Sequence, residues 1–222
     1  VFLVIFLLLS GSFTFYMGNF YERGQADLLP FFSFHPWLYL FLVPAISMKL
    51  WAEERKSGTI ELILTLPVKV KEVVIGKYLA AWFFIALALF LTFPIWLTVN
   101  YLGSPDNGAI LSGYLGSLLM SGGFLAIGSC MSSVTQNQVI AFIIFVFVCF
   151  IFLLSGTNLV LDFFNTWLPQ GAVDAIASLS FLSHFSSLSK GVIDLRDFIY
   201  YISLIGVFIY INVELVNIKK GG

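Results

Sequence analysis

The densest group of charged side chains in this sequence lies in the stretch WAEERKSGTIELILTLPV, Trp51–Val68. Only 10% of the chain is charged, so this local density stands out. The charged residues of the stretch are Glu53, Glu54, Arg55, Lys56 and Glu61. Carboxylate, ammonium and guanidinium groups gathered in this way could form charge-assisted hydrogen bonds with a charged partner. They could equally belong to an ordinary loop at the membrane surface. The predicted elements around them must distinguish a partner-binding segment from such a loop.

Nucleotide hydrolysis has no motif in this chain. The phosphate-binding loop G-x-x-x-x-G-K-[ST] does not occur in the sequence. The sequence LMSGG at 119–123 is similar to a signature loop of nucleotide-binding ATPases, but it lies in an apolar segment that no nucleotide reaches. Small residues are typical of packed membrane helices, and we interpret this one as packing.

Hydrolytic and metal chemistry also lack their motifs. Neither G-x-S-x-G nor H-E-x-x-H occurs, and we interpret His184 as a residue of the membrane interface. His35 falls in another segment expected outside the membrane. Cys130 and Cys149 lie in apolar segments, with no spacing that indicates a disulfide framework or a metal site. The sequence therefore predicts a chain without catalytic residues, metal or cofactor of its own.

The composition is that of a multi-pass helical membrane protein. Of the 222 residues, 59% are hydrophobic, and the mean hydropathy is +0.98. Soluble proteins carry about 25% charged residues. The net charge of −1 does not indicate a nucleic-acid partner. Because roughly 20 apolar residues cross a bilayer, we predict one all-α domain over residues 1–222 with six spans, at about 1–17, 36–50, 78–101, 111–131, 139–161 and 198–218. The abrupt apolar start leads us to expect that residues before the first span are missing from this numbering.

The distribution of Lys and Arg predicts the orientation. Six alternating spans put eight basic residues on one side: Lys49, Arg55, Lys56, Lys69, Lys71, Lys77, Lys219 and Lys220. The other side keeps three, which are Arg23, Lys190 and Arg196. Since cytoplasmic loops carry the excess of basic residues, we expect the loop 51–77 and both termini in the cytoplasm.

The predicted spans are almost free of charge. Glu214 is the exception, and its place near the cytoplasmic end of the last span favours pairing with Lys49 or Arg55 over a role in proton coupling. Ion-coupled carriers usually place ionisable residues within their spans. A carrier driven by an ion gradient is therefore disfavoured, and the energy source is expected in another chain.

Two loops between spans have the character of short helices. In the loop 51–77, Gly58 or Thr59 could begin a helix that covers 60–66 and ends at Pro67. A helix of two turns is marginal alone, so we expect its apolar surface to dock in the groove of a partner. The external segment 162–197 has apolar residues at helical spacing, interrupted near Trp167 and Pro169. It predicts helices that lie at the outer interface or dip back into the membrane.

The charged stretch also carries a family resemblance. The motif E-E-R-K-S-G-T-I-E-L-I-L-T-L-P at 53–67, between a second span and a G-K-Y-L-A third span, resembles the permease subunits of type-2 ABC transporters. The similarity is strongest to the branch associated with gliding motility and nitrous-oxide-reductase maturation. A second motif, H-F-x-x-L-S-K-G-V-I-D at 184–194, precedes the last span. Members usually begin with an amphipathic interfacial helix before the first span, which this numbering does not contain.

The resemblance implies a division of labour between chains. It implies a bacterial inner-membrane subunit that works with two cytoplasmic ABC ATPases, which hold ATP and Mg²⁺, and with a second permease copy or a paralogue. It implies that 58–66 is a coupling helix docked in an ATPase cleft, and that 162–197 forms paired external re-entrant helices. The implied coupling residues are Glu53, Glu54, Arg55, Gly58, Thr59, Ile60, Glu61, Leu62, Leu64 and Pro67. The implied external residues are Trp167, Pro169, His184, Phe185, Gly191 and Asp194.

Two functions remain open at this point. The first is a transporter subunit that moves substrate when the ATPases close. The second is a membrane subunit that transmits ATPase-driven motion to an extracytoplasmic partner protein without transport. The fourth and fifth spans are so apolar that a hydrophilic pore is disfavoured. A lipid-linked or protein-like substrate that leaves laterally, or mechanical transmission without transport, fits these spans better.

Overall fold

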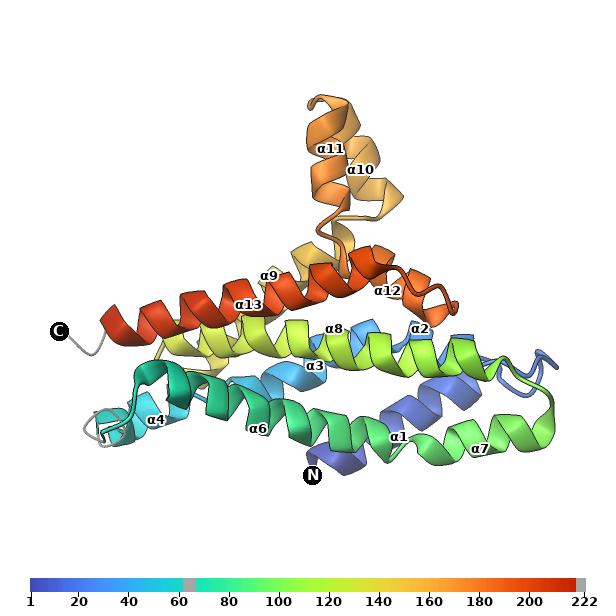
Figure 1. The fold of residues 1–222 in the computed structure, drawn as a ribbon, viewed down its shortest axis with the longest axis horizontal. Helices are drawn as coiled ribbons and strands as arrows, with labels where there is room; N and C mark the ends of the chain where they lie inside the picture. Colours follow the sequence, from blue (N-terminus) through green and yellow to red (C-terminus); the bar gives the residue numbers. More distant parts are fainter. Residues whose placement is uncertain (62–66, 219–222) are drawn as a thin grey trace.

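The computed structural model describes residues 1–61 and 67–218, and in these residues every regular element is a helix. The all-α prediction is therefore confirmed. The elements are α1 Phe2–Ser12, the π-helical turn η1 Phe13–Met17, α2 Leu29–Ser33, α3 His35–Ser47, α4 Ala52–Ser57, α6 Val70–Phe90, α7 Phe93–Leu102, α8 Asn107–Val134, α9 Gln138–Leu154, α10 Asn158–Asn165, α11 Gln170–Ala177, α12 Phe181–Ser189 and α13 Leu195–Ile218. The long helices α6, α8 and α13 run side by side along the molecule, while α10 and α11 stand away from them (Figure 1).

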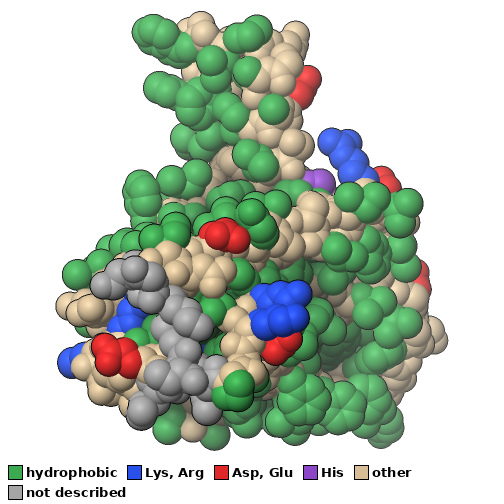
Figure 2. All heavy atoms as spheres, turned by 60° about the vertical axis from the view of Figure 1, so that its left-hand side comes forward, with side chains coloured by type: hydrophobic (Ala, Val, Ile, Leu, Met, Phe, Trp, Pro, Cys, Tyr) green, Lys and Arg blue, Asp and Glu red, His purple; other side chains and the backbone are tan. Residues whose placement is uncertain are grey.

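Length and hydropathy identify the membrane-crossing helices. Three segments are long and apolar enough to cross a membrane, namely 70–102, 107–134 and 195–218. A fourth counts if α9 and α10 form one bent span, and Phe2–Met17 is a shorter apolar helix. Figure 2 shows a surface covered largely by hydrophobic side chains, as a lipid-embedded chain requires. The chain is thus a multi-pass membrane protein, and the count of six spans stays a prediction.

Helix α8 is the centre of the bundle. In its most apolar window 72% of the residues are buried, against 28% in the segment 70–102 and 22% in 195–218. It contacts α3, α6, α9, α12 and α13, which surround it. Such a central position requires that many neighbours approach one helix closely, and small residues permit this approach.

Glycines on α8 make room for its neighbours. A Cβ at Gly113 would overlap the ring of Phe32, and one at Gly128 would overlap the side chain of Ser47 on α3. A Cβ at Gly123 would lie 3.0 Å from the Phe181 ring of α12. The small-residue pattern predicted from the sequence therefore acts in packing.

Side chains of α6 and α3 also bind α8 by hydrogen bonds. Tyr78 and Trp82 of α6 donate to the carbonyls of Gly122 and Leu118, each at 3.1 Å. The Tyr39 hydroxyl of α3 lies 2.7 Å from that of Ser117. A hydrogen bond within an apolar medium satisfies groups that have no water to bind, so these contacts fix the helices relative to one another.

The predicted third span, 78–101, is divided in the structure. Helix α6 begins earlier, at Val70, and ends at Phe90. Helix α7 starts after Leu91 and Thr92, with Pro94 in its first turn. Proline lacks an N–H and fits the first turn of a helix, so Pro94 suits the start of α7 just after the break.

The chain leaves the bundle after α9. This helix ends at Leu154, earlier than the predicted end of the fifth span at 161, and α10 is bent from it by 77°. Helices α10 and α11 pack on each other and form a projection that we call the arm, residues 158–177 (Figure 1, top). A Cβ at Gly156 would lie 2.5 Å from Ser180, so glycine lets the two ends of the arm cross closely.

The packing at Gly128 yields a stability prediction. Gly128→Ala should destabilise the fold by about 1–3 kcal/mol, because the added methyl group overlaps Ser47 in a buried contact. Gly76→Ala on α6 is the control, since its Cβ would meet nothing within 4 Å and alanine favours a helix. Thermal unfolding in detergent measures both, and equal midpoints for the two variants would contradict the role given to Gly128.

Candidate functional site

The charged stretch forms a short helix at one end of the bundle. Glu53 and Glu54 occupy the first turn of α4, and Arg55 and Lys56 occupy its last turn. This order of charges complements the helix dipole. Gly58 ends α4 with φ of +73°, a left-handed conformation that glycine adopts without strain. The helical conformation resumes at residues 59–61, so Gly58 ends α4 and directly precedes the next helical residues, as expected of a residue that could begin a helix.

Two serines of α8 hold the start of α4. The Ser132 hydroxyl accepts hydrogen bonds from the backbone N–H groups of Trp51 and Ala52, at 3.2 and 3.1 Å, and donates to the Met48 carbonyl at 3.0 Å. The Ser129 hydroxyl accepts from the Trp51 indole at 3.2 Å. We call Ser129 and Ser132 the serine anchor. The serine anchor provides hydrogen-bond partners for backbone groups between the end of α3 and the start of α4, where they are buried from solvent.

The serine anchor extends to the last helix. Asn212 of α13 donates from its side-chain amide to Ser129 Oγ at 2.7 Å. The Trp51 side chain is fully buried and packs with Val70 and Val74 of α6 and Val216 of α13. One tryptophan therefore contacts three long helices, and a displacement of α4 must move them or break these contacts.

Lys77 of α6 completes the attachment. Its ammonium group donates to the Leu50 carbonyl at 2.9 Å and lies 4.5 Å from the centre of the Trp51 ring. It also forms an ion pair with Glu54. Cation–π and ion-pair contacts at a partly buried position reinforce each other. Glu54 is thus engaged within the chain, whereas Glu53 and Glu61 are exposed and free of any ion pair among the described residues.

The remaining predicted coupling residues surround this attachment. The Thr59 hydroxyl donates to the Glu54 carbonyl at 3.3 Å, and Ile60 packs partly buried on the Trp51 cluster. Pro67 is exposed, two residues before α6 is capped. Leu62 and Leu64 lie outside the described residues, and so does most of the predicted helix 60–66. Glu214 makes no ion pair with Lys49 or Arg55 in the part of the chain that the structure describes.

His184 lies in a second polar cluster, at the foot of the arm. Its Nδ1 lies 2.6 Å from Asp197 Oδ1, its Nε2 lies 2.9 Å from the Ser178 carbonyl, and its ring stacks on Tyr200 at 4.1 Å. The side chain is only 7% exposed, so it is buried among protein groups, and its place at the level of the membrane interface stays a prediction. Both ring nitrogens face oxygen atoms, which fixes the ring and joins α12 to α13. No catalytic nucleophile accompanies this pair in the described structure: the ring's partners are a carboxylate and a backbone carbonyl.

The other predicted external residues have structural contacts. Trp167 is exposed at the tip of the arm, and Pro169 caps α11. Phe185 is buried against the core, and Asp194 Oδ1 accepts from the Arg196 backbone at 2.9 Å, at the start of α13. Gly191 has φ of +85° and lies against Ala109, so it needs the freedom of glycine.

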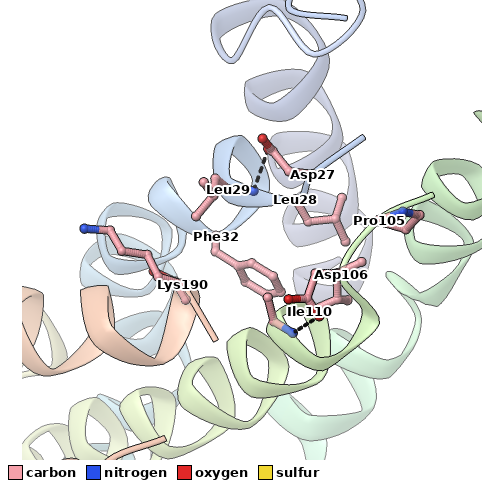
Figure 3. Close-up of a pocket in the computed structure, with 10 residues that line it drawn as sticks. Asp27, Leu28, Leu29, Phe32, Pro105, Asp106, Ile110 and Lys190 are labelled. Atoms are coloured by element: carbon pink, nitrogen blue, oxygen red, sulfur yellow. Dashed lines mark hydrogen bonds between the residues drawn. The ribbon is translucent and has the colours of Figure 1, made fainter. Parts of the chain in front are cut away.

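Asp27, Asp106 and Lys190 are among the residues that line a hollow of about 250 Å³, and the Lys190 side chain points away from the two carboxylates (Figure 3). Asp27 Oδ1 accepts from the Leu29 backbone at 3.1 Å, and Asp106 Oδ1 accepts from Gly108 at 2.9 Å. Asp106 is thus the N-cap of α8, and Asp27 binds the first N–H of α2.

Several residues of these clusters carry no signal in the sequence. Ser129, Ser132 and Asn212 look like ordinary polar residues of apolar spans, and Asp197 lies 13 positions from His184. The one available hint is a tryptophan that begins a charged loop, because a buried indole N–H needs an acceptor. The structure brings Glu54, Thr59 and Ile60 to one attachment and keeps the external residues apart from it.

Comparison with known proteins identifies a family over most of the chain. The profile of the family described as ABC-2 family transporter protein matches residues 10–216. No curated protein matches the chain.

The serine anchor predicts a local loss of stability. Ser132→Ala should cost about 1–3 kcal/mol, because the N–H groups of Trp51 and Ala52 lose their acceptor in a buried place. Ser203→Ala is the matched control, since this exposed hydroxyl binds only a carbonyl of its own helix. Thermal unfolding, and the rate at which a protease cuts in 52–57, report the effect. Equal unfolding midpoints and equal cutting rates for the two variants would show that the serine anchor does not stabilise α4.

The histidine pair yields a further prediction. Asp197→Ala should destabilise the protein by about 1–3 kcal/mol, since it leaves a buried histidine nitrogen without its hydrogen-bond partner. Asp197→Asn keeps an oxygen acceptor and should lose less. Asp174→Ala, an exposed carboxylate on α11, should leave the unfolding midpoint unchanged. If Asp174→Ala and Asp197→Ala lower the midpoint equally, the pair does not join α12 to α13.

Proposed function

Because this chain belongs to the ABC-2 transporter family, it is a membrane subunit of an ATP-binding-cassette transporter, and we propose that it couples ATP hydrolysis in separate cytoplasmic ATPases to the movement of a substrate. Members of this family normally work with ABC ATPase partners. In the proposed complex the partners hold ATP and Mg²⁺, and this chain contributes no catalytic residue.

The attachment of α4 supports the coupling role. A segment that receives force must be joined firmly to the helices that it moves, and Trp51 is joined to α6, α8 and α13 at once. Two-state packing contacts of this kind carry coupling between distant sites. The exposed Glu53 and Glu61 beside this attachment suit the rim of an interface with a basic groove.

The assembly is proposed from the family resemblance. Two copies of this chain, or this chain and a paralogue, would pair with two ATPases in the inner membrane of a bacterium, with the α4 end in the cytoplasm. The resemblance to the gliding-motility and nitrous-oxide-reductase-maturation branch is part of the same proposal. Segment 58–66 would dock into the ATPase cleft.

The arm favours a second candidate function. Its exposed apolar side chains Leu159 and Phe163 lie one turn apart on α10, Trp167 follows the end of that helix, and α10 buries no residue of its own. Such a stripe suits an extracytoplasmic partner protein as well as membrane lipid. In this second function ATPase-driven motion would be transmitted to the partner without transport.

Charge reversal at Glu61 tests the coupling role. In the reconstituted complex, Glu61→Lys should reduce the stimulation of ATPase activity by roughly tenfold, because it opposes the basic groove proposed for the partner. Glu22→Lys, an exposed reversal in the first external loop, should leave stimulation unchanged. Deletion of 60–66 should abolish stimulation while the chain stays in the membrane. A Glu61→Lys complex that retains bound and fully stimulated ATPase would refute the coupling role.

A further inference from the structure

A hollow of about 780 Å³ lies near the α4 end of the bundle, beside the cluster around Trp51. One wall is the start of α6, residues 68–71. The opposite wall is a single face of α13, formed by Gly206, Ile209, Tyr210, Val213, Glu214 and Asn217. These positions recur every three or four residues and extend over about 16 Å of helix.

One part of this hollow is apolar. Gly206, Ile209 and Val213 of α13 line it, and an added Cβ at Gly206 would meet nothing within 4 Å. We call the surface along these three residues the apolar strip; it is open, as the site of a hydrocarbon chain must be.

The opposite end of the hollow is charged. Lys69 and Lys71 lie at the start of α6, and Glu214 faces them from α13. The lining therefore carries two positive charges and one negative charge. Figure 2 shows basic and acidic side chains gathered at this end of the molecule, while the body beyond is hydrophobic. The change from charge to apolar surface is what a membrane–water boundary produces.

We propose that this hollow binds one anionic phospholipid, with its phosphodiester at Lys69 and Lys71 and an acyl chain along Gly206 and Ile209. Basic pockets between membrane helices at this level bind anionic lipid headgroups. The positive charges of Lys69 and Lys71 favour a phosphate group. The apolar strip favours a lipid over free phosphate, because only the lipid has an acyl chain to place there. The site does not depend on the proposed coupling role.

The bound lipid would bridge two helices that hold the α4 attachment. Val70 and Val213, which line the hollow, also pack in or against the cluster around Trp51. A ligand that binds only when α6 and α13 stand in this arrangement stabilises it by mass action. The lipid would therefore act as a stabilising ligand of the inner half of the bundle.

A pair of glycine variants tests the acyl-chain part. The purified full chain is titrated with phosphatidylglycerol, and bound lipid is counted by native mass spectrometry. Gly206→Leu fills the strip and should weaken the tightest binding by at least about tenfold, while leucine itself favours the helix. Gly76→Leu, on an open face of α6 outside the hollow, should bind like the parent chain. Equal binding by the two variants overturns the proposal.

Lysine variants test the headgroup part. Lys69→Gln and Lys71→Gln should each weaken phosphatidylglycerol binding by about fivefold. Lys56→Gln, an exposed lysine of α4, should not. Glu214→Gln removes the opposing charge and should tighten binding, a gain that no misfolded variant would show.

The choice of lipid completes the test. Phosphatidylglycerol should bind at least about tenfold tighter than phosphatidylcholine or phosphatidylethanolamine. If phosphatidylethanolamine binds best and Glu214→Gln weakens its binding, the site recognises a zwitterionic headgroup. The proposal of an anionic lipid is then wrong. If all three lipids bind alike, the hollow holds only annular lipid. If inorganic phosphate competes fully, the acyl chain contributes nothing, and the proposal is also overturned.

Discussion

Close approach to α8 is the constraint on which the rest of this structure depends. Apolar surface gives little advantage to helix association in lipid, so dispersion contacts and internal hydrogen bonds must hold the bundle together. Glycines let rings and serine side chains touch the α8 backbone, as at Gly113 and Gly128. Polar side chains of the same helix then reach α3, α4 and α13. The close packing and the polar contacts of the bundle therefore both involve the surface of α8.

Contacts toward both ends of α8 hold neighbouring helices. Near one end Ser129 and Ser132 bind the start of α4, and nearer the other end Gly116 lies against Leu188 of α12. Helix α12 is tied to α13 through His184 and Asp197. A rigid helix with discrete contacts at both ends is the kind of element through which distant sites are coupled. The proposed function requires such an element between an ATPase and the outer face.

Much of the fold could be predicted from composition and periodicity. The membrane class, the all-α architecture and the packing role of the small residues followed from hydropathy and spacing. Contacts between distant positions could not be predicted. Lys77 pairs with Glu54 and lies over Trp51, yet nothing in the local sequence distinguishes it from other lysines near a span. Burial of His184 likewise depends on Asp197 and Tyr200, which only the fold brings to it.

The bounds of the helices were also difficult to predict, for a second reason. The fifth span was predicted to 161, but the chain bends by 77° between α9 and α10, across Ser155, Gly156 and Thr157. Gly156 lies against Ser180, a contact between distant positions that hydropathy does not contain. Similarly, α3 has 13 residues, fewer than a bilayer requires, because its apolar run is shared with α2 and with the buried Trp51.

The early turn after α9 makes bilayer thickness a variable of this protein. A helix of 17 residues rises about 25 Å, less than the hydrocarbon core of a typical membrane, which is about 30 Å. With α9 placed across a bilayer, the arm would leave it before the far surface is reached, carrying apolar side chains that avoid water. A thinner membrane would leave the arm at the headgroups, and a thicker one would cover it with acyl chains, each at a cost of hydrophobic mismatch. In that placement the chain length of the host lipid would set the depth of the arm.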